Sequence, residues 1–379
     1  MTLYLVVLAS VLTSIAQRGS KVTLSLYALD LGAGSLAVGV LAALFATFPL
    51  LLAVHAGKVS DRLGVRLPML AGGLTMALAL TAPVFFPHLN ALYACAALLG
   101  LGHIFFHVSV HNLIGSFGGA AERTRNFATF SLGSSVAAFI GPSAAGFSIE
   151  YAGFAPALLL LAGSAALPAL VLLGYRPPAV KAEPQGEQAQ STFDLLAIPA
   201  LRRTLLMSGV ALTGIELFSF YLPIYGRSIG LAPSSIGMVL SCYAVAGFIV
   251  RAVMHRLARR YTEIGLLTAS LFLASATYLL LPALHEGLLL ALAAFALGLS
   301  LGSAQPLTII LTYNQAPKGR SGEALGMRIM ANKVTQIGVP LAFGGLGAAM
   351  GAAPVFFATG GFLFLAGLLS LKFAKGTAG

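Results

Sequence analysis

Twelve runs of about twenty mostly apolar residues follow one another along this chain, separated by short polar stretches. A helix needs about 20 such residues to cross a bilayer. The backbone in lipid must satisfy its own hydrogen bonds, which a helix does within one segment. Barrel strands would alternate with period two, and these runs do not. The sequence therefore predicts an all-α integral membrane protein with twelve transmembrane helices over residues 3–27, 36–56, 68–87, 89–116, 126–149, 154–174, 204–226, 234–254, 263–282, 286–314, 323–348 and 354–372.

The composition argues against a soluble protein. Hydrophobic residues make up 58% of the chain and charged residues 9%, whereas soluble domains carry about 25% charged residues. The net charge of +11 could indicate a nucleic-acid partner, but the cations fall in short clusters between the apolar runs. We therefore expect a lipid bilayer as the surroundings and no nucleic acid as a partner. Cys95 and Cys242 lie inside apolar runs, where small buried side chains are expected.

The distribution of Lys and Arg predicts the orientation. If the N-terminus is cytoplasmic, seventeen of these residues fall in inner loops and the C-terminal tail, and only Arg227 falls in an outer loop. Cytoplasmic loops are rich in Lys and Arg. We predict that both termini are cytoplasmic. Short loops and compact length are typical of a multi-pass protein of the bacterial inner membrane.

The longest polar stretch, residues 175–203, is rich in Pro, Gln and Glu and is typical of a flexible linker. It divides the chain into two predicted six-helix bundles, residues 1–174 and 204–379. Similar short patterns recur in both halves at an offset near 200, for example Pro142 with Gly146 and Pro340 with Gly344. A recurrence in register indicates a duplicated unit, hence two pseudo-symmetric bundles.

The polar run from Gly57 to Arg66 separates the second and third apolar runs. Its pattern, G-x-x-x-D-R-x-G-x-R, is expected to form a tight turn with glycines at both ends. At this position it resembles the signature loop of the major facilitator superfamily. The resemblance implies a conformational latch on the cytoplasmic side, formed by Gly57, Asp61, Arg62, Gly64 and Arg66. The alternative is an ordinary solvated, positively charged inner loop.

The fifth apolar run contains four small or helix-bending residues, Gly133, Gly141, Pro142 and Gly146. They resemble the glycine–proline motif of proton-driven antiporters in this superfamily, although alanines precede Gly146 where a paired glycine is usual. The resemblance favours export by antiport. The alternative is close packing of small residues between helices. Many proton-coupled members also have an Arg early in the fourth helix, and residues 95–100 contain none.

The fourth run contains His103, His107 and His111, spaced so that all three lie on one helix face. The rise from the first to the last is about 12 Å, too long for one metal ion to bind all three. We expect no metal site. Histidines titrate near neutral pH, which suits proton handling, and the resemblance places this helix at the central cavity. The alternative is that they hold helices together by polar contacts. We favour His103 or His107 for a transport role.

Ionisable residues inside a membrane are costly and usually functional. Four cations, Arg18, Lys21, Arg328 and Lys333, are expected inside the membrane, and Glu216 is the one clear acid expected there. We predict proton coupling at Glu216, with His103, His107 and Asp30 as further candidates, and a possible pairing of Glu216 with Arg18. The predicted substrate-cavity residues are Arg18, Lys21, Gln305, Arg328, Asn332, Lys333 and Gln336.

The surplus of cations favours an anionic or zwitterionic substrate. The alternative is that Lys21 and Arg328 extend toward the two membrane surfaces and leave little charge inside. The resemblance implies a secondary transporter that works by alternating access, and we predict proton-coupled efflux of a small organic solute by a monomer. A proton-coupled importer or a facilitator of the same fold remains the alternative. We expect no enzymatic activity, no cofactor and no ATP hydrolysis, because H-E-x-x-H, acidic metal and P-loop motifs are absent from the sequence.

Overall fold

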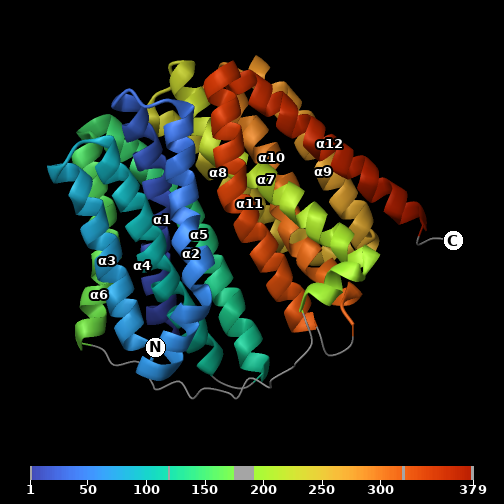
Figure 1. Cartoon of the computed structure of the whole chain (residues 1–379), viewed down its shortest axis with the longest axis horizontal. Helices are drawn as coiled ribbons and strands as arrows, with labels where there is room; N and C mark the ends of the chain where they lie inside the picture. Colours follow the sequence, from blue (N-terminus) through green and yellow to red (C-terminus); the bar gives the residue numbers. More distant parts are fainter. Residues whose placement is uncertain (1, 118–119, 175–191, 318–320, 377–379) are drawn as a thin grey trace. The chain divides into compact units, whose positions relative to one another are not determined.

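The apolar runs fold into helices. The structure, a computed structural model, describes residues 2–117, 120–174, 192–317 and 321–376, and within these ranges it contains helices and no strand (Figure 1). The first six helices are α1 (Thr2–Asp30), α2 (Ser35–Leu63), α3 (Arg66–Phe85), α4 (Leu89–Ser116), α5 (Ala120–Ala152) and α6 (Phe154–Gly174). The later ones are α7 (Pro199–Ser228), α8 (Pro233–Arg260), α9 (Glu263–Leu280), α10 (Gly287–Gln315), α11 (Ser321–Met350) and α12 (Ala352–Gly376), with short 3₁₀ helices η1 (Thr192–Ala197) and η2 (Leu281–Ala283).

Each predicted run corresponds to one of these helices. The predicted bounds of α4 and α6 agree with the structure, whereas α2, α7 and α8 extend by several polar residues. Within the described ranges eleven helices are long and apolar enough to cross a membrane, and α11 is the helix that does not meet this measure. Helix α11 falls below the measure because it contains two cations and two amides, Arg328, Lys333, Asn332 and Gln336. Twelve spans and cytoplasmic termini therefore stay predictions.

The chain forms two compact units. Unit 1 comprises Met1–Gln185 and Gly226–Ser241, and unit 2 comprises Gly186–Tyr225 and Cys242–Gly379. The last residues of α7 and the first residues of α8 thus belong to unit 1. Residues 175–191 of the predicted linker lie outside the described residues, and its remainder forms η1 and the first turn of α7. The division into bundles at 175–203 stays a prediction.

In unit 1, α1 packs against α4, α5 and α6, and α4 packs against α2 and α3. A core of α1, α3, α4 and α6 side chains includes Val6, Met69, Phe106 and Leu172. Helices approach closely at glycines: a Cβ on Gly100 of α4 would lie 2.7 Å from the Phe45 carbonyl oxygen of α2. Small residues permit such backbone contacts between membrane helices.

In unit 2, α9 packs against α10 and α12, and α11 packs against α10, α12 and η1. The buried Leu195 of η1 joins Leu201, Leu205, Ala324 and Met327 in a small core. This contact fixes the start of α7 against the start of α11. It also determines where the polar residues of these two helices lie.

The two units repeat one another at an offset of 198 residues. The close contact of Gly100 with the Phe45 carbonyl oxygen in unit 1 recurs in unit 2 between Gly298 and the Tyr243 carbonyl oxygen. Both members are shifted by 198 residues, from 100 to 298 and from 45 to 243. Pro142 and Pro340 differ by the same number. The offset predicted near 200 is therefore refined to 198 by equivalent helix contacts.

Candidate functional site

In unit 2, hydrogen bonds among Glu216, Gln336 and Lys333 join α7 to α11. We call these three residues the Glu216 cluster. Lys333 Nζ donates to Gln336 Oε1 at 2.9 Å, and Gln336 Nε2 donates to Glu216 Oε1 at 3.0 Å. All three side chains are half-buried. Lys333 and Gln336 lie on the same face of α11 because they are three residues apart. A neutral amide thus links an acid of α7 to a cation of α11.

A second polar group, the Arg328 cluster, joins α11 to α10. Arg328 is 5% exposed. Its guanidinium donates to the side-chain oxygen of Gln305, to the Gln305 backbone carbonyl at 3.2 Å and to Thr308 Oγ1 at 3.0 Å. Of the four cations predicted within the membrane, Arg328 is the one that the structure buries. Its planar fork suits several simultaneous bonds.

Further polar residues, not predicted from the sequence, connect these helices. Ser208 of α7 donates to Asn332 Oδ1 of α11 at 3.1 Å, and Thr204 donates to Gln315 Oε1 of α10 at 2.7 Å. Thr204 and Ser208 lie four residues apart and precede Glu216 on the same stripe of α7. This spacing was the available signal. Hydroxyl groups in a helix commonly bond to the backbone of that helix, so these two were not expected to contact other helices.

The proline of α10 exposes a carbonyl that another helix uses. Pro306 has no N–H group, so the carbonyl oxygen of Gly302, four residues earlier, lacks its usual helical donor. Arg251 Nε of α8 donates to that oxygen at 3.2 Å. The segment of α10 around Gln305 and Pro306 is therefore joined by hydrogen bonds to both α8 and α11 within unit 2.

The three histidines of α4 form the predicted stripe. The ring centroids of His103 and His107 are 5.1 Å apart, and those of His107 and His111 are 4.2 Å apart. His111 Nδ1 lies 3.0 Å from the His107 carbonyl oxygen. Phe130 of α5 packs edge-on against His111, with centroids 4.8 Å apart. Among the described residues no group of three His, Cys, Asp or Glu side chains has the arrangement of a metal site.

The repeat relates this stripe to the Arg328 cluster. At the offset of 198, His107 corresponds to Gln305 and Phe130 corresponds to Arg328. Phe130 contacts His107 with centroids 5.9 Å apart, and Arg328 bonds to Gln305. The α4–α5 contact of unit 1 thus pairs a histidine with an aromatic ring. The equivalent α10–α11 contact of unit 2 pairs an amide with a cation.

The two cations of α1 contact different helices. Arg18 is exposed and lies 3.5 Å from Ser134 Oγ of α5. The Lys21 ammonium lies 6.0 Å from the centre of the Phe45 ring of α2. The predicted pairing of Arg18 with Glu216 would join the two units, and it stays a prediction.

Asp30, at the end of α1, pairs with Arg227, at the end of α7, with 3.1 Å between Oδ1 and NH2. Both side chains are about half exposed. Nearby in unit 1, the Ser234 backbone N–H, in the first turn of α8, donates to Glu150 Oε2 at 3.1 Å. A carboxylate at a helix N-terminus is favoured by the helix dipole. Asp30 is thus an exposed partner in an ion pair, and its predicted part in proton coupling stays a prediction.

The predicted turn beginning at Gly57 is wrong. Helix α2 continues through Gly57 to Leu63, because its polar residues there follow helical spacing and Arg62 is exposed. The connection to α3 is only Gly64 and Val65, and Gly64 has a φ of +76° that favours glycine. Arg66 donates to the Leu172 carbonyl at 2.9 Å and to the Leu173 carbonyl at 2.7 Å, at the C-terminal end of α6. The Asp61 side chain lies outside the described part of the structure. The latch stays a prediction.

The glycines of α5 lie at close helix contacts of unit 1. A Cβ on Gly133 would lie 2.8 Å from Val11 Cγ2, and one on Gly141 would lie 3.1 Å from the Ile15 carbonyl oxygen, both on α1. Gly146 lies against Pro233 and Pro142 lies against Gly237, both at the start of α8. The segment therefore packs tightly on two sides. Its role in antiport stays a prediction.

Gly298-Leu299-Ser300-Leu301-Gly302 fits the G-x-S-x-G pattern of hydrolase nucleophiles. That chemistry needs a strand–turn–helix elbow, and this segment lies inside α10. Ser300 is buried and bonds to the Leu297 carbonyl of its own helix at 3.0 Å. The glycines serve packing, because a Cβ on Gly302 would lie 2.6 Å from Gly247 Cα of α8.

Comparisons with known proteins agree with this architecture. Multidrug resistance protein 1 of Bacillus subtilis (strain 168) is 24% identical over 327 residues, covering 85% of this chain and 84% of that protein. A peptide transporter POT superposes with a TM-score of 0.82 at 17% identity, over 98% of this chain and 94% of that one. The nucleoside transporter NupG gives 0.82 at 13% identity, over 98% and 99%. These structural likenesses show a transporter fold.

The family model of the Major Facilitator Superfamily matches residues 6–337 and, again, 204–378. The second match begins near the start of α7, as expected for a duplicated unit. With eleven candidate membrane spans in the described residues, the chain is a multi-pass integral membrane protein and a member of the Major Facilitator Superfamily.

Proposed function

We propose that this protein moves a small organic solute across the membrane by alternating access, with proton-coupled efflux as its mode of transport. The observation that carries the proposal is the Glu216 cluster, in which an acid inside the candidate membrane span α7 is linked through Gln336 to Lys333 of α11. An acid kept in such a place costs free energy and usually has a function. Protonation of Glu216 would change its bond to Gln336 and thereby the contact between α7 and α11.

The charges of unit 2 support an anionic or zwitterionic substrate. Arg328 and Lys333 of α11 lie in hydrogen-bonded clusters in which, among the described residues, Glu216 is the acid. A guanidinium in a low-dielectric site binds carboxylates well. Gln305 Nε2 is buried and makes no hydrogen bond to the described residues, so a donor is available beside Arg328.

Efflux is supported by the similarity to Multidrug resistance protein 1 and by the predicted antiporter-type segment of α5. A proton-coupled importer or facilitator of the same fold is the second candidate, and it is favoured by the fold likeness to peptide and nucleoside transporters. The two differ in whether protons and solute move in opposite directions or together.

The test is proton flux in liposomes containing the purified protein, recorded with a pH dye while anionic, zwitterionic and cationic compounds are added. We expect anionic or zwitterionic compounds to drive proton movement, and Glu216→Gln to abolish it. Glu286→Gln is the matched control, because Glu286 is an exposed acid at the start of α10. The proposal would be contradicted if no compound drives proton movement, or if proton movement in Glu216→Gln equals that of the natural protein. Solute and protons moving in the same direction would replace efflux by import.

A further inference from the structure

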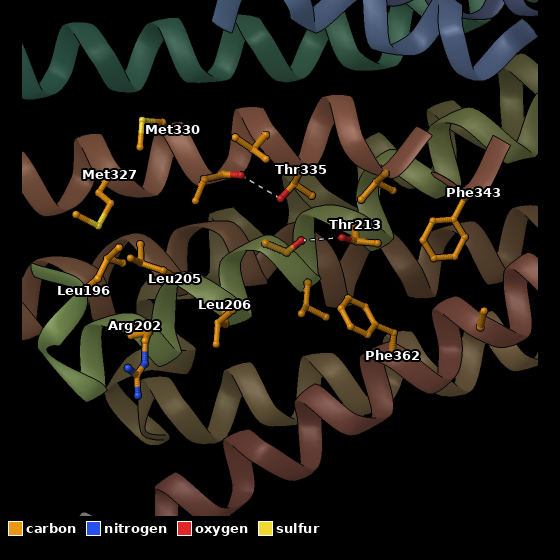
Figure 2. A pocket seen from close by; sticks show the side chains of 16 residues that line it. Leu196, Arg202, Leu205, Leu206, Thr213, Met327, Met330, Thr335, Phe343 and Phe362 are labelled. Carbon is orange, nitrogen blue, oxygen red and sulfur yellow. Dashed lines mark hydrogen bonds between the residues drawn. The ribbon is translucent and has the colours of Figure 1, made fainter. Parts of the chain in front are cut away.

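Unit 2 contains an elongated apolar groove with a cation at one end. The cavity has a volume of about 730 Å³ and is lined by η1, α7, α11 and α12. Figure 2 shows Arg202 at one end of the row of lining side chains, and Phe343 and Phe362 at the other. In Figure 1 the ribbon of α7 lies between α11 and α12. Leu206, Met330 and Val334 are 63%, 46% and 59% exposed, so the groove is open along its length.

The groove has the depth of one membrane leaflet. Its α7 wall is a single stripe of residues at helical spacing, Arg202, Leu205, Leu206, Gly209, Val210 and Thr213. The rise from the first to the last is about 16 Å, and half of a hydrocarbon core is about 15 Å. Arg202 lies in the first turn of α7 and is exposed. In a bilayer spanned by α7, a cation in its first turn would lie at headgroup level, and the apolar wall would continue to the middle of the bilayer.

The interior of the groove offers a ligand no free donor from its two hydroxyl groups. Thr213 Oγ1 donates to the Gly209 carbonyl at 3.0 Å, and Thr335 Oγ1 donates to the Ala331 carbonyl at 3.0 Å. Both hydroxyl groups thus bond to their own helices, as the dashed lines of Figure 2 mark. The occupant must be apolar along its length and polar at one end only.

The repeat shows how this place differs between the two units. In unit 1, Gly133 and Gly141 lie at close contacts of α5 with α1. At the offset of 198 their counterparts are Ala331 and Val339, and both line the groove. Unit 2 thus has larger side chains on α11 where unit 1 has glycines at a helix contact. The counterpart of Arg202 is Tyr4, so the cation also belongs to unit 2 alone.

We propose that this groove binds an anionic phospholipid, with one acyl chain along α7, α11 and α12 and the phosphate at Arg202. A guanidinium binds phosphate strongly, and anionic lipids attract cations near the membrane surface. Arg202 is at the end of α7 that the distribution of Lys and Arg assigns to the cytoplasm, where anionic lipids have this effect. The site is independent of the polar clusters of α10 and α11 and of the direction of transport.

The chain contains no Trp, so one introduced Trp is an unambiguous fluorescent reporter. We would place it at Leu206 in the groove, and at Leu8, its exposed counterpart in unit 1, as the matched control. Each variant is reconstituted in phosphatidylcholine vesicles containing phosphatidylglycerol. The measurement is quenching of Trp emission by brominated phosphatidylglycerol, compared with quenching by an equal fraction of brominated phosphatidylcholine.

We expect Leu206→Trp to show about fivefold enrichment of phosphatidylglycerol over phosphatidylcholine, the equivalent of about 1 kcal/mol for one cation near the surface. Leu8→Trp should show none. Arg202→Gln should remove the enrichment, and Arg202→Lys should retain most of it. Arg203→Gln removes the same charge at the same depth from a residue that does not line the groove, and it should leave the enrichment intact.

Equal quenching by both lipids at Leu206→Trp would overturn the proposal. So would an enrichment that survives Arg202→Gln, or one that falls equally in Arg203→Gln, because the attraction would then belong to the surface as a whole. Displacement of both lipids by a neutral apolar solute would assign the groove to such solutes and would also overturn the proposal.

Discussion

Gln336 of α11 donates a hydrogen bond to Glu216 of α7, with 3.0 Å between Nε2 and Oε1. The same amide accepts from Lys333 through its oxygen. Both polar atoms of one side chain are thereby used to connect an acid with a cation. The amide is the element through which a change of charge at Glu216 would reach α11.

The contact between Glu216 and Gln336 is testable by a double-mutant cycle. Gln336→Met should lower the melting temperature of the purified protein, because it removes the donor while keeping a similar length. In a Glu216→Met background, where residue 216 cannot accept a hydrogen bond, the same change should have little further effect, giving a coupling of about 0.5–3 kcal/mol. Ser219→Ala is the control, since Ser219 bonds to its own helix. Additive effects of the two substitutions would show that the contact does not join α7 to α11.

Arg328 should stabilise unit 2. Arg328→Gln would remove the guanidinium that donates to the side-chain oxygen of Gln305 and to the Thr308 hydroxyl in a buried place, and hydrogen bonds from a charged group contribute about 1.5–3 kcal/mol. We expect the melting temperature of the purified protein to fall by a few degrees, with Arg328→Lys recovering only part because it lacks the planar fork. The exposed Arg203→Gln should change little. Equal melting temperatures for Arg328→Gln and Arg203→Gln would refute this assignment.

Pro306 and Arg251 should depend on one another. Arg251→Gln removes the donor of the Gly302 carbonyl, and the melting temperature should fall. In Pro306→Ala the backbone N–H of residue 306 can bond to that carbonyl within the helix. Arg251→Gln should therefore lower the melting temperature less in the Pro306→Ala background than in the natural sequence. The same loss in both backgrounds would mean that Arg251 acts elsewhere.

The ion pair of Asp30 with Arg227 should contribute little to coupling. Both side chains are about half exposed, and exposed pairs are usually worth 0–1 kcal/mol. Asp30→Asn should change compound-driven proton flux by less than about fivefold, the equivalent of about 1 kcal/mol. The double variant with Asp30→Arg and Arg227→Asp should recover the proton flux that either substitution loses alone. Abolished flux in Asp30→Asn would instead make Asp30 a coupling residue.

The sequence predicted the helices well because length and hydropathy alone define a membrane span. It misjudged Gly57, since a glycine inside a run of polar residues fits a helix that leaves the membrane as well as a turn. The positive φ at Gly64 is the actual end of α2. The histidine stripe was predictable, because all three rings belong to one helix.

Contacts between helices were harder to predict. The bond of Ser208 to Asn332 joins positions 124 residues apart, and spacing along one helix says nothing about its partner. The groove beside Arg202 was missed for a similar reason. Its signal was present in the sequence, because Ala331 and Val339 replace the glycines at positions 133 and 141, but only the offset of 198 identifies them as counterparts.

The central claim, that Glu216 couples protons to solute movement, is tested most directly by comparing two assays on the same Glu216→Gln liposomes. One is compound-driven proton flux, and the other is exchange of labelled for unlabelled solute across the membrane, which needs no net proton movement. We predict that Glu216→Gln loses proton flux and keeps solute exchange, while Glu286→Gln keeps both. Proton flux that persists in Glu216→Gln would contradict the account, and loss of both activities would make Glu216 a substrate-binding residue in place of a coupling residue.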